Sequence, residues 1–167
     1  MKTKFRLVSV ALILLMGAFA CAFLVSRLEP QFETVDQAYV KAHMDKPGFL
    51  LVDVREEEVY NGKAPFEGIP GGHIPGAINF PGSVLGTPEA AASLARAGLT
   101  KNTTLILYCN AGLLSGQFAE TLVKDFHFRD SMIKTYKAGT LDWSRDPANK
   151  LEPEDHELGT RLTPDKK

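Results

Sequence analysis

Cysteine is scarce in this chain. Only Cys21 and Cys109 occur among the 167 residues, and there is no Cys-x-x-Cys pair. This pattern excludes a framework of disulfide bonds. Cys21 lies in an apolar N-terminal stretch, so Cys109 is the one thiol of the remaining chain.

An excess of positive charge is also missing. The chain has 19 basic and 20 acidic residues, and four of the basic residues precede Leu28. From Leu28 onward, 15 basic residues face all 20 acidic ones, a net charge of −5. This balance argues against nucleic acid as a partner. The acidic residues form no spaced pair suited to a metal site or to glycoside hydrolysis.

The N-terminal segment is unusually apolar. Leu7–Val25 is a nearly unbroken run of 19 apolar residues that follows three cations, so we expect an export signal or a membrane anchor. The length of the run favours an uncleaved anchor. In contrast, Ala18-Phe-Ala20 fits cleavage by signal peptidase, and the following Cys21 leaves lipidation open. In each case the positive-inside rule places the rest of the chain on the extracytoplasmic, periplasmic side.

We therefore expect three parts: a signal peptide or anchor over residues 1–27, one domain over 28–152 and a polar tail over 153–167. The middle part is near the common size of a single domain. Hydrophobic residues make up 44% of the chain, which is enough to cover a sheet.

Helical and strand patterns alternate along this middle part. Helices are predicted over 34–43, 88–97 and 116–126, helical turns at 56–60 and 141–144, and strands over 49–54, 77–80, 104–108 and 132–136. The stretch 61–76 is rich in Gly and Pro, so no regular structure is expected there. Alternation of this kind predicts an α/β fold, with a parallel sheet flanked by helices.

Cys109 ends one predicted strand and opens a loop of small residues that leads into a helix. The loop amides are expected to surround the sulfur, with contributions from Asn110, Ala111, Gly112, Leu113, Leu114 and Ser115. A helix N-terminus adds a positive dipole, so the sulfur would be an activated nucleophile. The alternative is that Cys109 is a small buried hydrophobic residue at a strand end.

Asp53 also ends a predicted strand. The carboxyl ends of parallel strands share one sheet edge, so we expect Asp53 and Cys109 to meet there.

Three segments carry a resemblance to a known family. Leu51-Val-Asp-Val-Arg-Glu56, Gly72-His-Ile-Pro-Gly-Ala-Ile-Asn-Phe-Pro81 and Tyr108-Cys-Asn-Ala-Gly-Leu-Leu-Ser-Gly116 resemble, in order, two signatures and the active loop of the rhodanese family of sulfurtransferases. The loop is most similar to that of small exported single-domain members from bacterial phage-shock operons. The resemblance implies a thiosulfate:thiol sulfurtransferase that needs no metal or organic cofactor.

The resemblance also implies roles for individual residues. Cys109 would take a sulfur atom from a small sulfur-donor anion or a persulfide and pass it, as a persulfide, to cyanide or to a thiol acceptor. Asp53 and Arg55 are expected to form a network under the loop rather than to react themselves. His73 is expected to make structural hydrogen bonds, with a role as general base as the alternative.

Two features depart from the family pattern. Many members carry a cationic or other polar side chain where this chain has Leu113 and Leu114, so no cation in the loop can hold a sulfonate. Loss of one charge-assisted hydrogen bond costs about 1.5–3 kcal/mol of anion binding. Thiosulfate would then be a poor substrate, and an organic persulfide or a protein thiol would be a better partner.

The second departure is a long segment over 61–70, which either lines the mouth of the site or is a surface insertion.

Two other function classes remain. A phosphatase or an arsenate reductase also uses a cysteine loop, but such loops are closed by arginine, and the next arginine here is Arg129. A non-catalytic or redox-sensing module that binds a partner at the membrane fits the apolar loop.

Overall fold

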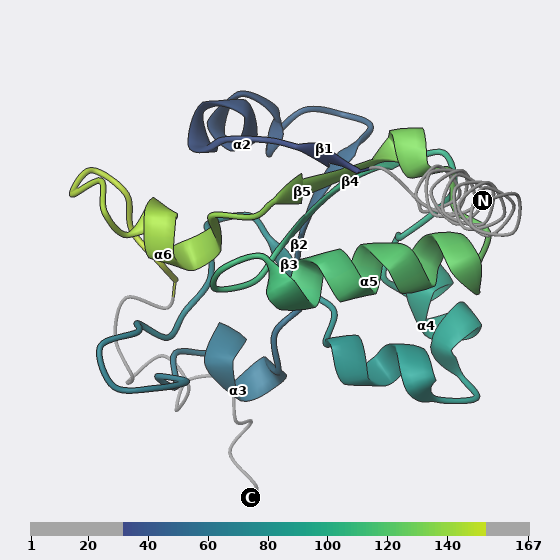
Figure 1. Cartoon of the computed structure of the whole chain (residues 1–167), viewed down its shortest axis with the longest axis horizontal. Helices are drawn as coiled ribbons and strands as arrows, with labels where there is room; N and C mark the ends of the chain where they lie inside the picture. The colour runs from purple at the N-terminus through teal and green to yellow at the C-terminus, as the bar shows by residue number, and fades with distance from the viewer. Residues whose placement is uncertain (1–31, 153–167) are drawn as a thin grey trace, which may run out of the picture. The chain divides into compact units, whose positions relative to one another are not determined.

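Five parallel strands form the sheet of this domain in the computed structural model, which describes residues 32–152 (Figure 1). The strands are β1 (Glu33–Thr34), β2 (Phe49–Asp53), β3 (Ile78–Asn79), β4 (Thr104–Tyr108) and β5 (Ile133–Tyr136). They lie in the order β1-β5-β4-β2-β3, and every pairing is parallel. The predicted α/β domain with a parallel sheet is confirmed.

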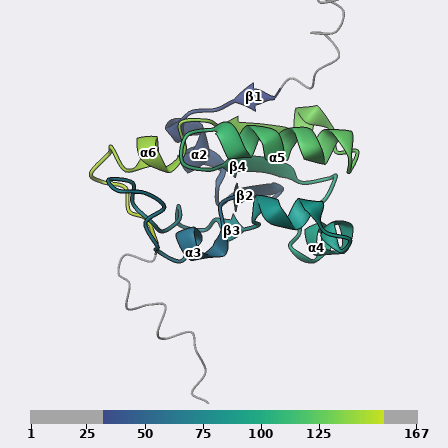
Figure 2. The same ribbon diagram turned by 60° about the horizontal axis from the view of Figure 1, so that its bottom comes forward.

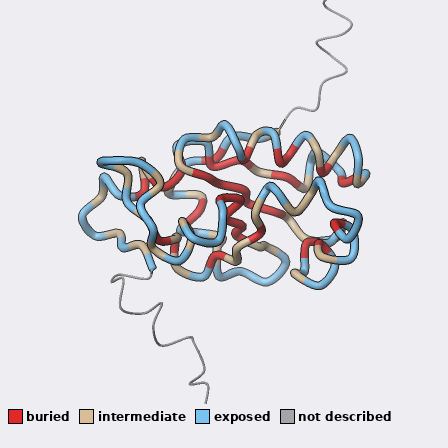
Figure 3. The backbone as a smooth tube through the Cα atoms, turned by 90° about the horizontal axis from the view of Figure 1, so that it is seen from below, coloured by how far each residue is buried: buried red, intermediate tan, exposed pale blue. Residues whose placement is uncertain are grey.

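Helices connect the strands and cover both faces of the sheet (Figure 2). The α-helices are α2 (Gln37–His43), α3 (Glu57–Tyr60), α4 (Ala90–Arg96), α5 (Leu113–Lys124) and α6 (Gly139–Trp143). Two short 3₁₀-helices are η1 (Gly82–Gly86) and η2 (Asp130–Met132). The buried residues gather along the strands and on the inward sides of the helices (Figure 3).

The central strand β4 divides the core between the two faces. Leu105 and Leu107 pack in one cluster with residues of α4 and α5, and Cys109 continues this alternation onto the same side. Ile106 and Tyr108 pack in the other cluster, with Val40 of α2 and Trp143 of α6. The side chains of a strand point alternately to opposite faces, so the strand itself directs Cys109 toward α5.

The N-terminal element differs from the prediction. The predicted helix over 34–43 begins only at Gln37, because Glu33 and Thr34 pair with β5 as a fifth strand. The Asp36 carboxylate accepts a hydrogen bond from the Tyr39 amide at 2.8 Å and thereby caps the helix. The helix prediction was therefore wrong at its first residues.

The helix after the cysteine loop also begins elsewhere than predicted. It was expected from Gly116 but starts at Leu113, directly after Gly112. Helix α4 is shorter than predicted, and the 3₁₀-helix η1 before it was not predicted.

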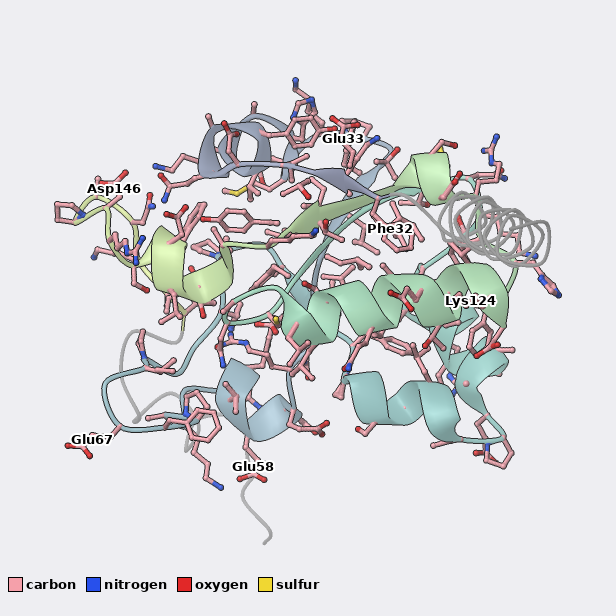
Figure 4. All side chains as sticks on the ribbon, in the orientation of Figure 1. Phe32, Glu33, Glu58, Glu67, Lys124 and Asp146 are labelled. Carbon is pink, nitrogen blue, oxygen red and sulfur yellow. The ribbon has the colours of Figure 1, made fainter. Side chains whose placement is uncertain are left out.

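The stretch 61–76 contains no helix or strand, as expected. An isolated bridge joins Phe66 and Ile69 within it, and the Phe66 side chain is largely exposed. Figure 4 shows Glu67 pointing away from the body of the domain. This long segment therefore presents side chains to solvent at its tip.

The end of the described chain is held to the domain. The Trp143 indole donates to Lys150 O at 2.9 Å, and His73 and Glu152 form an isolated antiparallel bridge. Within residues 32–152, no helix combines the length and the apolar character needed to cross a membrane. The predicted anchor over 7–25 and the predicted tail over 153–167 lie outside the described residues.

Candidate active site

Cys109 lies directly after β4, at the carboxyl edge of the sheet. The residue is 2% exposed, and its thiol is free. Ala111, two positions along the loop, is exposed. The carboxyl edge of a parallel sheet is where open α/β folds place their ligands.

The Gly112 amide N–H donates to the Cys109 Sγ at 3.1 Å. Gly112 immediately precedes the first residue of α5. Its φ of +87° is a backbone conformation that residues with a side chain rarely adopt. The sulfur therefore faces both an amide donor and the positive end of a helix dipole. Both favour a negative charge on sulfur.

Fewer loop amides contact the sulfur than the six that the sequence predicted. Among residues 32–152, Gly112 supplies the one amide that hydrogen-bonds the sulfur. The Ser115 hydroxyl oxygen accepts from the Cys109 thiol at 3.9 Å, and the hydroxyl itself donates to the Gly112 carbonyl oxygen at 3.3 Å. Leu113 and Leu114 belong to the first turn of α5 rather than to the loop, and their exposed fractions are 72% and 48%. The helix starts early, so the loop is shorter than the sequence suggested.

Asp53 and Arg55 form a buried ion pair beside the loop. Arg55 Nη2 lies 2.6 Å from Asp53 Oδ2, and Nε donates to Oδ1 at 2.9 Å. The side chains are 2% and 0% exposed. Asp53 also lies in register with Tyr108, the residue before Cys109, so the two strand ends meet as predicted.

Arg55 connects this pair to the cysteine loop. Its Nη1 donates to Asn110 Oδ1 at 2.8 Å, and its Nη2 donates to the Gly72 carbonyl oxygen at 2.6 Å. The guanidinium thus joins the end of β2, the segment before His73 and the loop after β4. Of the three predicted supporting residues, Asp53 and Arg55 are in direct contact within this network, and His73 is not part of it.

Thr140 was not predicted as a site residue, yet it also holds the cysteine loop. Its hydroxyl donates to Asn110 Oδ1 at 3.1 Å, and its amide donates to the Cys109 carbonyl oxygen at 3.0 Å. Gly139 precedes it with φ of +59°, and a Cβ atom there would overlap the Cys109 carbonyl oxygen. No local sequence motif predicts these contacts, because they join segments 30 residues apart.

His73 lies away from the sulfur. Its Nδ1 is 2.9 Å from the Tyr60 carbonyl oxygen, its ring stacks on the Tyr60 ring with centroids 3.6 Å apart, and its Nε2 is 3.8 Å from Glu152 Oε2. None of these contacts reaches the cysteine loop. The geometry is that of a structural histidine.

Tyr108, the residue before Cys109, is tied to the segment over 72–81. Its hydroxyl oxygen accepts a hydrogen bond from the Ile74 amide at 3.0 Å. Burial, reinforced by the negative charge of Asp53, raises the pKa of the Tyr108 phenol well above its ordinary value. The phenol therefore stays neutral beside the buried carboxylate.

A shallow groove of about 370 Å³ runs between η1 and α5. Leu114, from the first turn of α5, forms part of its lining, with Val54, Leu85 and Phe118 as apolar neighbours. Glu56 and Asp125 add carboxylates to it. The groove lies next to the helix turn that follows the cysteine loop.

No cluster of three or more metal-ligating side chains occurs in the part of the chain that the structure describes. The nucleophile that the site offers is the Cys109 sulfur. An amide donor and a helix dipole can stabilise that sulfur as an anion, and neighbouring residues hold the loop in place.

Comparison with known proteins agrees with this geometry. A family model described as Rhodanese-like domain matches residues 36–146. A comparison with curated protein sequences found no significant match.

Several solved structures share the fold. An anaerobic ergothioneine biosynthesis enzyme from Chlorobium limicola, in complex with its natural substrate trimethyl histidine, matches with a TM-score of 0.65 and 21% identity over 73% of this chain and 28% of that chain. Wild-type EanB matches with a TM-score of 0.66 and 20% identity over 74% of this chain and 28% of that chain. An EanB variant holding ergothioneine covalently linked with a persulfide gives a TM-score of 0.65 and 21% identity over 73% of this chain and 28% of that chain. The chain thus spans about 28% of the length of these structures, and at such identities the likeness concerns the fold alone.

Proposed function

Because the chain belongs to the rhodanese-like family, a family of sulfur-transfer proteins, we propose that it is a sulfurtransferase that carries sulfane sulfur as a persulfide on Cys109. The observation that carries the proposal is the 3.1 Å hydrogen bond from the Gly112 amide to the Cys109 sulfur, at the N-terminus of α5. This arrangement stabilises a thiolate before sulfur is taken up and a persulfide anion afterwards.

The reaction has two steps. The Cys109 thiolate attacks the outer sulfur of the donor, the sulfur–sulfur bond of the donor breaks, and the leaving group departs with the bonding electron pair. With thiosulfate the leaving group is sulfite. A thiolate or cyanide then attacks the terminal sulfur of the persulfide and releases Cys109 as a thiolate, so the enzyme returns to its first state.

The buried network supports this chemistry without taking part in it. Arg55 and Thr140 both donate to the Asn110 side-chain oxygen, so two residues fix this part of the loop. Asp53 orients Arg55 through its carboxylate, while His73 holds the neighbouring segment. These residues position the loop so that the Gly112 amide faces the sulfur in both steps.

The mouth of the site favours a partner with apolar character. Leu113 and Leu114 expose their side chains in the first helical turn after the loop, and the groove along α5 continues from Leu114. An organic thiol or a thiol on a protein surface can bury this apolar area, whereas cyanide cannot. We therefore place a thiol ahead of cyanide as the acceptor.

The N-terminal sequence supports a location for this activity. We propose that the protein is exported or membrane-anchored, with the domain on the periplasmic side, because cations precede an apolar run over 7–25. Protease treatment of spheroplasts tests this: the domain should be digested in intact spheroplasts if it lies outside, and protected if it lies in the cytoplasm.

A second function is favoured by one observation. Cys109 is only 2% exposed, as expected for a cysteine that serves packing in a non-catalytic or redox-sensing binding module. In that case the exposed leucines would bind a partner protein.

Turnover distinguishes the two functions. The full chain is incubated with thiosulfate or with glutathione persulfide, and the transfer of sulfur to a thiol or to cyanide is followed. Transfer by the wild type but not by Cys109→Ser supports the sulfurtransferase. Equal background transfer by both proteins, with the thiol reduced, would leave the binding module as the better account.

A further inference from the structure

Residues 109–115 carry no cationic side chain, although thiosulfate, one of the two proposed donors, is an anion. The nearby Arg55 does not fill this gap. It is 2% exposed, and its guanidinium is taken up by Asp53, Asn110 and the Gly72 carbonyl oxygen. Its charge is already balanced within the buried pair.

The fold brings a second cation to the loop from a distant part of the chain. Lys137 directly follows β5, whose carboxyl end lies beside that of β4. A Cβ atom at Gly112 would lie 2.8 Å from the Lys137 carbonyl oxygen and 2.9 Å from the Lys137 Cβ. The base of the lysine side chain therefore touches the residue whose amide donates to the sulfur.

The ammonium group of Lys137 is uncommitted. The residue is exposed, and within residues 32–152 its side chain has no ion pair or hydrogen bond. Lys41 and Lys134, by contrast, both pair with carboxylates. A lysine carries its charge on a flexible four-carbon stem, so from this base the ammonium can reach a ligand that sits against the sulfur.

We propose that Lys137 supplies the cation that the loop lacks when thiosulfate is the donor. The ammonium binds the oxygen atoms of the donor while the outer sulfur faces Cys109. The thiolate attacks this sulfur, the sulfur–sulfur bond breaks, and sulfite leaves with the electron pair while still beside the ammonium. This inference rests on the proposed function and adds a substrate-binding residue to it.

The expected energetic effect is moderate, because the ammonium is exposed to solvent and to salt. Replacing Lys137 by glutamine should raise KM for thiosulfate about three- to tenfold. The value of kcat at saturating donor should change little, because the lysine binds the oxyanion before and after the sulfur is transferred. Lys137→Arg keeps the charge and should restore most of the affinity.

The experiment compares the full-length wild type with Lys137→Gln, Lys137→Arg and a matched control, Lys101→Gln. Lys101 is also an exposed lysine, but it precedes β4 and so lies at the opposite end of that strand from Cys109. Two donors are used: thiosulfate, a dianion, and an alkyl thiosulfonate, which carries one charge fewer and leaves as a sulfinate. KM is measured for each donor at low and at high salt.

The inference predicts a larger rise in KM for thiosulfate than for the thiosulfonate in Lys137→Gln only, and a salt dependence that is weaker in this variant than in the wild type. Equal KM values in Lys137→Gln, Lys101→Gln and the wild type would overturn the assignment of Lys137 while leaving the sulfurtransferase intact. If the wild type takes sulfur from neither donor nor from an organic persulfide, the proposed function fails and the assignment of Lys137 fails with it.

Discussion

Arg55 Nη1 lies 2.8 Å from Asn110 Oδ1, so a buried cation at the end of one strand holds the residue that follows Cys109 at the end of its neighbour. The same guanidinium neutralises Asp53, which is 0% exposed. Loop position and domain stability are therefore coupled through one side chain.

This coupling makes Arg55→Met strongly destabilising. The substitution leaves the Asp53 carboxylate buried without its counter-ion, and breaking such a pair from one side costs about 3–5 kcal/mol. The double variant Asp53→Leu with Arg55→Met removes both charges and should be clearly more stable than the single variant. Urea unfolding measures both. A loss below about 1 kcal/mol in Arg55→Met would show that the ion pair carries little of the stability.

Gly112→Ala should abolish most of the activity while the domain still folds. A Cβ atom at this position meets the Lys137 backbone, and the φ of +87° is strained for alanine, so the amide has to turn away from the sulfur. We expect the rate of sulfur uptake to fall by about tenfold to a hundredfold, the cost of losing one hydrogen bond to a charged group.

The matched control for that variant is Gly116→Ala. Gly116 lies within α5, no neighbour stands within 4 Å of its would-be Cβ, and its φ is not positive. Alanine there should leave sulfur uptake unchanged and stabilise the domain by about 0.5–1 kcal/mol. Equal activity losses in the two variants would mean that the position of the Gly112 amide is not the cause.

Leu113→Arg should strengthen the binding of thiosulfate. The side chain is 72% exposed in the first turn of α5, so the domain can accept arginine without repacking. A guanidinium next to the sulfur adds a charge-assisted hydrogen bond, which we expect to lower KM for thiosulfate by about tenfold. Leu113→Gln is the control for lost apolar area, and it should leave KM for thiosulfate near that of the wild type.

Alkaline pH should destabilise the domain through Tyr108. Its phenol has a pKa raised by burial and by Asp53 in the folded state, whereas the unfolded state has the ordinary value near 10. The stabilisation is therefore fully present below pH 10 and is lost as the pH rises above it, by up to about 1.4 kcal/mol per pH unit. Urea unfolding measures this between about pH 9 and about pH 11.5, a range that spans the ordinary tyrosine pKa of about 10. The free energy of unfolding should fall less steeply with pH in Tyr108→Phe than in the wild type. An identical decline in both proteins would assign the effect to other groups.

The central part of the fold could be predicted from the sequence. Thr104–Tyr108 is a short apolar run bounded by turn residues, and Cys109 at its end is marked by the small residues that follow. Such signals are local, so one sequence is enough to interpret them. The same holds for Phe49–Asp53, whose continuous apolar character reflects burial on both faces of the sheet.

Other parts depend on contacts between distant segments. Glu33 and Thr34 form a strand only because they pair with Lys134 and Thr135, about a hundred positions away in the sequence. Thr140 and Lys137 reach the cysteine loop for the same reason, and nothing near them in the sequence marks a site. The start of α5 at Leu113 was missed because Gly112, rather than Gly116, is the glycine that precedes the helix.

The persulfide itself is the most direct test of the account. The full chain, with Cys109 reduced, is incubated with thiosulfate and separately with glutathione persulfide, and its intact mass is then measured beside that of Cys109→Ser. The account predicts a gain of one sulfur, about 32 Da, on the wild type alone, and its reversal by a thiol acceptor. An unchanged wild-type mass with both donors, or the same gain on Cys109→Ser, would contradict the claim that Cys109 carries the sulfur.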